Sequence, residues 1–257
     1  MTHPDIDLFR KIWKGGYYGG DPMHPINCRE YGDLGLISVN NAVYRGLVLP
    51  NINPETVVVE IGPGRGAWTR GMLGAKFLYC LDVLSAEHND FWAYVGEAAR
   101  EKISYFEVSD ASVSVVPDEA ADFIFSFGAF CHIDPVLQND YLKNLYRVAK
   151  PGAVGVIMFA NFDKSNAALD NIGKLRAVPA TLTGVNYSLR YNVGRLLSAW
   201  TKEGRQDKTD TTPRPGRFYH RDIDDFAAAL ETAGWNVIMP DVGLNHRDAI
   251  ALFRKDR

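Results

Sequence analysis

One stretch constrains the fold more than any other: residues 57–67, which read Val-Val-Val-Glu-Ile-Gly-Pro-Gly-Arg-Gly-Ala. The three successive β-branched valines predict a short strand that is buried on both faces. Three glycines, Gly62, Gly64 and Gly66, follow, and glycine lets a ligand approach backbone N–H groups without meeting a Cβ. A glycine turn between a strand and a helix forms a nucleotide pocket. The stretch therefore predicts an α/β fold built around a nucleotide site.

Strand and helix patterns alternate after this turn. Strands are predicted over residues 57–61, 76–81, 103–108, 121–127, 153–159, 235–239 and 249–253. Helices are predicted over residues 35–49, 67–73, 86–100, 135–148 and 222–233. This alternation is typical of a parallel sheet that carries helices on both faces. The 257 residues, 46% of them apolar, suffice for one such domain with additions.

The pattern divides the chain into four parts. They are a helical and loop cap (1–50), a nucleotide-binding core (51–160), an insertion or lid for substrate (161–217), and a helix and β-hairpin that complete the core (218–257). The insertion has no strand pattern, and one helix is predicted near residues 191–202. Seven Lys or Arg and only three Asp or Glu lie between residues 195 and 221. This segment is either a solvated loop or a flap that contacts an anionic or polyhydroxyl substrate.

Composition excludes several classes of protein. The net charge of −3 disfavours a nucleic-acid-binding protein. Three separated cysteines without a CxxC pair indicate reduced thiols and no zinc framework. We find neither a signal peptide nor an apolar run long enough for a membrane helix. We therefore expect a cytoplasmic protein that contacts neither membrane nor nucleic acid.

The turn alone fits two cofactors, NAD(P) and S-adenosyl-L-methionine (SAM). Asp82 lies 22 residues after Glu60, where a carboxylate can accept from both ribose hydroxyls of either cofactor. Glu60, just before the glycines, suits the ammonium group of SAM and would repel a pyrophosphate. Asp110, after the third strand, can accept from the adenine amine. Because the chain also closes with a strand pair, we favour SAM. An NAD(P)-dependent oxidoreductase and a non-catalytic binding protein remain open.

These motifs resemble those of class I SAM-dependent methyltransferases. The likeness covers residues 55–160 and 218–255, and includes Leu145-Tyr-Arg-Val-Ala-Lys-Pro-Gly152 before the fifth strand. It implies a Rossmann-like fold with a seven-stranded, mostly parallel sheet, an antiparallel last strand, and helices on both faces. It also implies SAM as cofactor, bound by Glu60, Gly62, Gly64, Gly66, Asp82, Asp110, Ala111 and Phe127.

The segment after the fourth strand faces the reacting methyl group in this family. It reads Phe127-Gly-Ala-Phe-Cys-His-Ile-Asp134 and lacks the (Asn/Asp)-Pro-Pro-(Tyr/Phe) sequence of enzymes that methylate base amines. A histidine there offers a base with a pKa near neutral. His132 is thus our candidate general base, with Asp134 to orient it. Alternatively, His132 caps the next helix or lines the pocket passively.

The sequence Ser126-Phe-Gly-Ala-Phe-Cys-His132 is loosely similar to bacterial O-methyltransferases of sugars and small molecules. We therefore expect O-methylation of a small or carbohydrate-like hydroxyl, with Tyr18, Asp134 and His220 as candidate substrate contacts. A metal-assisted O-methyltransferase, suggested by Asn161 and Asp163, and a small-molecule N-methyltransferase are the alternatives. A divalent metal is not favoured, and a homodimer stays open.

Overall fold

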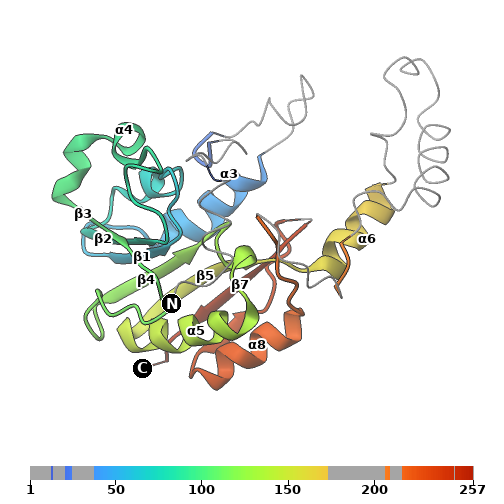
Figure 1. Cartoon of the computed structure of the whole chain (residues 1–257). Coiled ribbons are helices and arrows are strands. Elements are labelled where there is room, and N and C mark those ends of the chain that lie inside the picture. Colours follow the sequence, from blue (N-terminus) through green and yellow to red (C-terminus); the bar gives the residue numbers. More distant parts are fainter. Residues whose placement is uncertain are drawn as a thin grey trace, which may run out of the picture.

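The computed structural model describes Trp13 and residues 21–24, 38–172, 206–208, 216–245 and 247–256. These residues form a seven-stranded sheet with the strand order β3-β2-β1-β4-β5-β7-β6 (Figure 1). The strands are β1 (Val57–Ile61), β2 (Phe77–Asp82), β3 (Ile103–Glu107), β4 (Ala121–Ser126), β5 (Ala149–Phe159), β6 (Asn236–Met239) and β7 (Ala249–Arg254). β1 to β5 pair in parallel, and β7 is antiparallel to both β5 and β6. The predicted sheet is confirmed.

Helices cover both faces of the sheet. Val58 and Val59 are both fully buried but belong to different core clusters, because neighbouring strand residues point to opposite faces. α5 (Pro135–Val148) and α8 (Ile223–Thr232) pack on the face of Val59. α3 (Val39–Val43) and α4 (Phe91–Val95) lie on the opposite side (Figure 1). This two-sided burial explains the continuous apolar run that β1 shows in the sequence.

Several helices are shorter than predicted. α5 has the predicted bounds, but the expected helix over 86–100 is α4 followed by a 3₁₀ helix, Glu97–Glu101. Gly96 separates them with a φ of 105°, which an α-helix does not accommodate. The helix expected over 67–73 is a 3₁₀ helix, Thr69–Met72. The one expected over 35–49 is α3, a π-helical stretch (Tyr44–Val48) and a 3₁₀ turn (Leu49–Asn51).

One α-helix among the described residues was not predicted. α6 (Phe162–Ile172) begins the segment 161–217 and extends away from the sheet in Figure 1. The helix predicted at 191–202 lies outside the described residues. No helix in the described ranges is both long enough and apolar enough to cross a membrane.

Candidate active site

A cavity lies at the carboxyl ends of the parallel strands, where the loops after β1, β2, β3 and β4 meet. Parallel strands bring their carboxyl ends to one edge of a sheet, so residues far apart in sequence converge there. The cavity lining includes seven of the residues singled out from the sequence: Gly62, Gly64, Asp82, Asp110, Phe127, His132 and Asp134. Three others of that set, Glu60, Gly66 and Ala111, do not line it.

The glycine turn is tied to the end of β2 by two backbone donors. The Gly62 N–H donates to the Leu81 carbonyl (2.7 Å), and the Gly64 N–H donates to Asp82 Oδ2 (3.0 Å). Gly62 has a φ of 72°, and a Cβ there would lie 2.2 Å from the Ala129 Cβ. The turn therefore needs glycine at this position both for its backbone conformation and for its contact with the loop after β4.

Asp82 is buried at the cavity wall. Its Oδ1 accepts from the Leu84 N–H (2.9 Å), and its side chain also bonds to Asn89. Burial raises the pKa of Asp82 to about 6, although the N–H groups of Leu84 and Gly64 oppose that rise by stabilising the charged form. Near neutral pH this carboxylate is an oriented acceptor at the end of β2, as the ribose role predicted for it requires.

The loop after β3 is held in place by α5. The Tyr141 hydroxyl donates to the Asp110 carbonyl (3.1 Å), and Asn144 Nδ2 donates to the Ala111 carbonyl (3.0 Å). The Asp110 carboxylate accepts from the Ser112 N–H (2.8 Å), and its hydrogen bonds with Ser112 lower its pKa. Asp110 is therefore an ionised acceptor at the cavity, whereas Ala111 is buried in the core beneath it.

Glu60 does not line the cavity. Strand alternation places it on the same face as Val58, and it is only 2% exposed. Its Oε2 accepts from the Thr69 hydroxyl (2.6 Å) and contacts Cys80 Sγ (3.7 Å), its neighbour on β2. Burial raises its pKa to about 7. The contact of Glu60 with an ammonium group, predicted from its position before the glycines, stays a prediction, and in this structure the partners of the carboxylate are Thr69 and Cys80.

Gly66 also has another role. Its φ is 92°, and a Cβ there would lie 2.2 Å from Val95 Cγ2 and 3.0 Å from Phe91 Cε2. The third glycine therefore lets α4 pack against the turn instead of lining the cavity.

His132 lies at the end of a 3₁₀ turn, Phe130–His132, that follows β4. Its Nδ1 lies 2.9 Å from the Arg217 carbonyl. Because a carbonyl only accepts, Nδ1 carries the proton, and Nε2 is the unprotonated nitrogen of the neutral ring. Burial lowers the pKa of His132 below its ordinary value, so the ring is neutral at pH 7. The Phe218 ring packs against it at 4.6 Å between centroids.

Asp134 begins α5. Its Oδ1 accepts from the N–H groups of Val136 (3.0 Å) and Leu137 (3.1 Å), as an N-cap residue does. The capping role that we considered for His132 therefore belongs to Asp134. The bond that fixes His132 comes from the Arg217 carbonyl, 85 residues away in sequence.

The cavity lining also includes residues that were not among the predicted site residues, and Trp13, Trp68 and Arg217 are three of them. Trp13 lines it and is anchored by two residues after β2: Trp13 Nε1 donates to Asn89 Oδ1 (3.1 Å), and His88 Nε2 lies 2.6 Å from the Trp13 carbonyl. Trp68 and Arg217 also line it. For Trp68 the signal was its place just after the glycine turn, and for Arg217 it was the local excess of basic residues before position 221.

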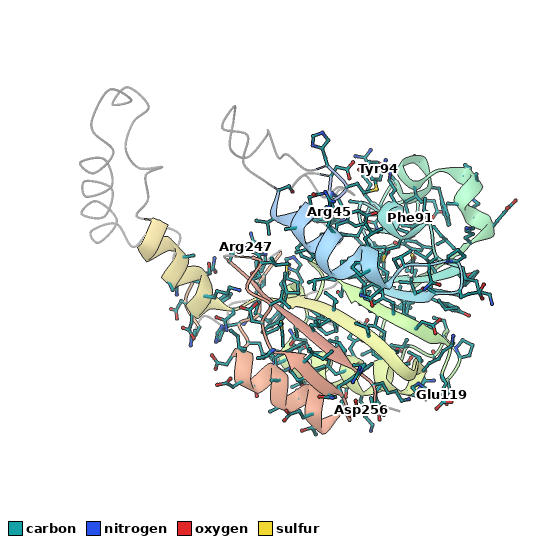
Figure 2. All side chains as sticks on the ribbon, turned by 180° about the vertical axis from the view of Figure 1, so that it is seen from behind. Arg45, Phe91, Tyr94, Glu119, Arg247 and Asp256 are labelled. Carbon is teal, nitrogen blue, oxygen red and sulfur yellow. The ribbon has the colours of Figure 1, made fainter. Side chains whose placement is uncertain are left out.

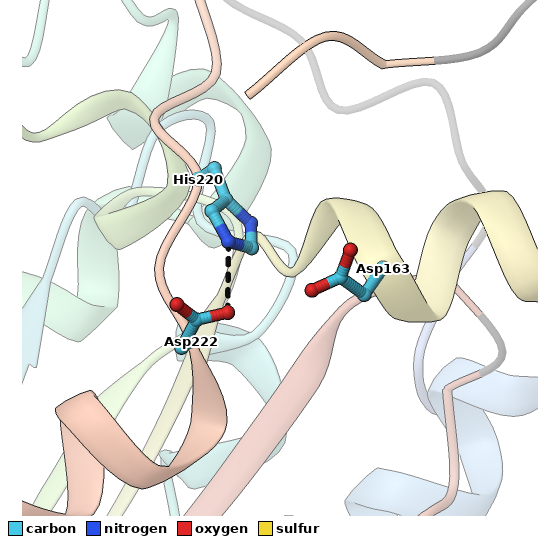
Figure 3. Close-up of side chains that lie close together, drawn as sticks. All are labelled: Asp163, His220 and Asp222. Carbon is cyan, nitrogen blue, oxygen red and sulfur yellow. Dashed lines mark hydrogen bonds and ion pairs between the residues drawn. The ribbon is translucent and has the colours of Figure 1, made fainter. Parts of the chain in front are cut away.

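His220 lies away from the cavity lining, in a cluster with Asp163 and Asp222 (Figure 3). Their ligand atoms lie within 4.8 Å of one another, as a cation site would require. Protein groups already satisfy them: His220 Nδ1 accepts from the Phe162 N–H (2.9 Å), and Nε2 bonds to Asp222 Oδ1 (3.0 Å). The Lys208 ammonium pairs with both carboxylates. The cluster thus joins α6 to the segments at 208 and 220–222. Tyr18 lies outside the described residues.

Comparisons with known proteins agree with this architecture. A family model described as a methyltransferase domain matches residues 42–239. A comparison with curated proteins found no match. Among solved structures, a SAM-dependent methyltransferase from Aquifex aeolicus is 15% identical, with a TM-score of 0.54, and the match covers 98% of this chain and 99% of that one.

Two structures from Burkholderia thailandensis are also similar. One is a 1,6-didemethyltoxoflavin N1-methyltransferase with bound 1,6-didemethyltoxoflavin and S-adenosylhomocysteine; it is 14% identical, with a TM-score of 0.51, over 80% of this chain and 72% of that one. The other, an O-methyltransferase family protein, is 15% identical, with a TM-score of 0.51, over 84% of this chain and 55% of that one. At these identities the likeness establishes the fold and leaves the acceptor open.

Proposed function

This chain belongs to the methyltransferase domain family and is a SAM-dependent methyltransferase, and we propose that it methylates a hydroxyl group of a small-molecule or carbohydrate-like acceptor with His132 as general base. Family membership sets aside the NAD(P)-dependent oxidoreductase and the non-catalytic binding protein. O-methylation, the nature of the acceptor and the role of His132 are the parts that we propose.

The cavity fits SAM. The Asp82 carboxylate suits the two ribose hydroxyls, and Asp110 suits the adenine amine. Gly62 and Gly64 line the cavity without a side chain, so a ligand can approach their backbone. When bound, SAM supplies an electrophilic methyl group on a sulfonium, which a hydroxyl oxygen attacks while the carbon–sulfur bond breaks. The remaining requirement is an acceptor for the hydroxyl proton.

One observation carries the proposal: the bond of His132 to the Arg217 carbonyl, on a residue that lines the cavity. It fixes the tautomer in which Nε2 is the basic nitrogen, and we propose that this nitrogen takes the hydroxyl proton, in the manner of a histidine oriented by a second group. The depressed pKa keeps the ring in its basic form at neutral pH. An amine that is already unprotonated has less need of such a base, which favours oxygen as the acceptor atom.

We propose that acceptor choice resides in the cap (1–50) and in the insertion (161–217). In support, each contributes a neighbour to the cavity: Trp13 lies in the cap, and Gly216 and Arg217 close the insertion. The guanidinium carbon of Arg217 lies 4.4 Å from the centre of the Tyr219 ring, so this residue of the cavity lining brings a cation and an adjacent aromatic ring. Such a wall suits a hydroxylated or anionic acceptor.

The test is acceptor screening followed by substitution of the base. The purified protein is given SAM and a panel of sugars, phenols and primary amines, and S-adenosylhomocysteine release and the methylated product are measured by mass spectrometry. We expect a methyl ether, formed equally well with EDTA present. Products methylated only on nitrogen would refute the choice of acceptor, and loss of activity with EDTA would favour a metal-assisted reaction.

His132→Gln should then lower kcat by about 10²- to 10⁴-fold, the usual worth of a general base, with unchanged affinity for S-adenosylhomocysteine. The exposed His24 provides the control, and His24→Gln should retain full activity. The active form of His132 is the unprotonated ring, and burial lowers its pKa. We therefore expect kcat/KM to rise with pH and then level off, with the midpoint of the rise below the ordinary histidine pKa of about 6.5. An His132→Gln variant with wild-type turnover would remove this residue from the mechanism.

A further inference from the structure

The methionine end of SAM carries a carboxylate as well as an ammonium group, and both need partners in a cavity that is partly shielded from water. Glu60, the residue that the sequence offered for this end, is committed to Thr69 and Cys80 outside the cavity. The negative charges that do line the cavity, Asp82 and Asp110 among them, suit donors and cations. A carboxylate therefore has to find donors elsewhere on the wall.

Two buried donors on the glycine turn lack a partner. Among the described residues, the buried side-chain nitrogens Arg65 Nε and Trp68 Nε1 are without a hydrogen bond. Both residues line the cavity, and Trp68 is only 4% exposed. Buried polar groups are almost always satisfied in native proteins, so two orphaned donors three residues apart call for an acceptor that the chain does not supply.

Packing holds both side chains in place. The Trp68 ring lies against Phe127 (4.5 Å between centroids) and Phe125 (5.1 Å). The Arg65 guanidinium carbon lies 4.9 Å from the centre of the Tyr94 ring on α4, which Figure 2 labels. Donors that are fixed before the ligand arrives lose little conformational entropy on binding. Arg65 also adds the positive charge that a carboxylate requires.

We propose that Arg65 and Trp68 bind the carboxylate of the methionine portion of SAM, with Arg65 Nε and Trp68 Nε1 as its donors. The other arginine of the lining, Arg217, belongs to the acceptor side because its carbonyl holds His132. The inference rests on SAM as the methyl donor and is independent of the acceptor and of His132.

Two ligands test it by calorimetry: S-adenosylhomocysteine, and 5′-methylthioadenosine, which keeps the adenosine and sulfur but lacks the amino acid. Arg65→Met removes the guanidinium and keeps most of the stem, and Trp68→Phe keeps a ring and removes the N–H. Each should weaken S-adenosylhomocysteine binding about tenfold or more, as expected for a hydrogen bond to a charged group. The affinity for 5′-methylthioadenosine should stay within about twofold of wild type.

Arg70→Met is the matched control. Arg70 lies over the same Tyr94 ring, also at 4.9 Å, but does not line the cavity, so both affinities should be unchanged. Unchanged S-adenosylhomocysteine binding in Arg65→Met and Trp68→Phe, or an equal loss for both ligands, would overturn the inference. Asp82→Asn should weaken both ligands. If it weakens neither, the cavity is not the cofactor site. That result differs from a failure of the Arg65 and Trp68 assignment alone, in which Asp82→Asn would still weaken both ligands.

Discussion

Binding of S-adenosylhomocysteine should weaken as the pH falls through about 6, because Asp82 must be ionised to accept from both ribose hydroxyls. Burial raises the pKa of this carboxyl from its ordinary 3.8 to about 6 in the free protein. Two hydroxyl donors stabilise the charged form, so the pKa falls in the complex. Binding at low pH therefore has to expel a proton, and the affinity is greatest above pH 6.

The magnitude follows from the ionised fraction. One pH unit below the pKa, about one carboxyl in eleven is ionised, so the dissociation constant should rise about tenfold between pH 8 and pH 5, which corresponds to about 1.4 kcal/mol. Calorimetric titration at pH 5, 6, 7 and 8 in buffers of differing ionisation enthalpy measures both the affinity and the proton released. The amino and carboxyl groups of the ligand titrate outside this range.

Asp82→Asn provides the control for this prediction, because an amide accepts a hydrogen bond but does not titrate. In that variant the affinity should be lower above pH 6 and nearly constant over the same range. A wild-type affinity that does not change with pH, or a variant that keeps the same slope, would refute the assignment of Asp82 to the ribose.

Two further predictions concern stability. Burial raises the pKa of Glu60 from 4.5 to about 7, so the buried charge destabilises the folded state increasingly as the pH rises from 4.5 to 7. Urea denaturation should therefore show that Glu60→Gln raises the free energy of unfolding by about 1–3 kcal/mol at pH 8 and does not raise it at pH 4.5. An effect of the substitution that is the same at both pH values would contradict this reasoning. Gly66→Ala and Gly96→Ala both place an alanine at positive φ, but only the Cβ at position 66 meets a neighbour, the Val95 side chain at 2.2 Å. Thermal denaturation should show a cost of about 1–2 kcal/mol for Gly96→Ala and about 1–3 kcal/mol more for Gly66→Ala, and equal losses would remove the packing argument.

Local patterns were sufficient for much of this protein. The valine run of β1 and the alternation of strands and helices predicted a parallel sheet with helices on both faces, and the resemblance to class I methyltransferases implied its seven strands and the antiparallel last one. Asp82 ends β2, Asp110 follows β3 and Gly62 follows β1, so the parallel topology brings all three to one edge. A residue at the end of a parallel strand can be placed from its position in the sequence, because the direction of the strand decides at which edge it lies.

Only the tertiary structure decided what each side chain meets there. Strand alternation turns Glu60 toward Thr69 and away from the cavity, and the hydrogen bond that assigns a tautomer to His132 comes from Arg217, 85 residues along the chain. Trp13 reaches the same cavity through Asn89, 76 residues away. Periodicity reports which face of an element is buried, but it does not encode which distant group packs against that face. The sequence by itself thus predicted the sheet and the edge where we propose that the cofactor binds, and the packing of distant segments determined which side chains line that edge.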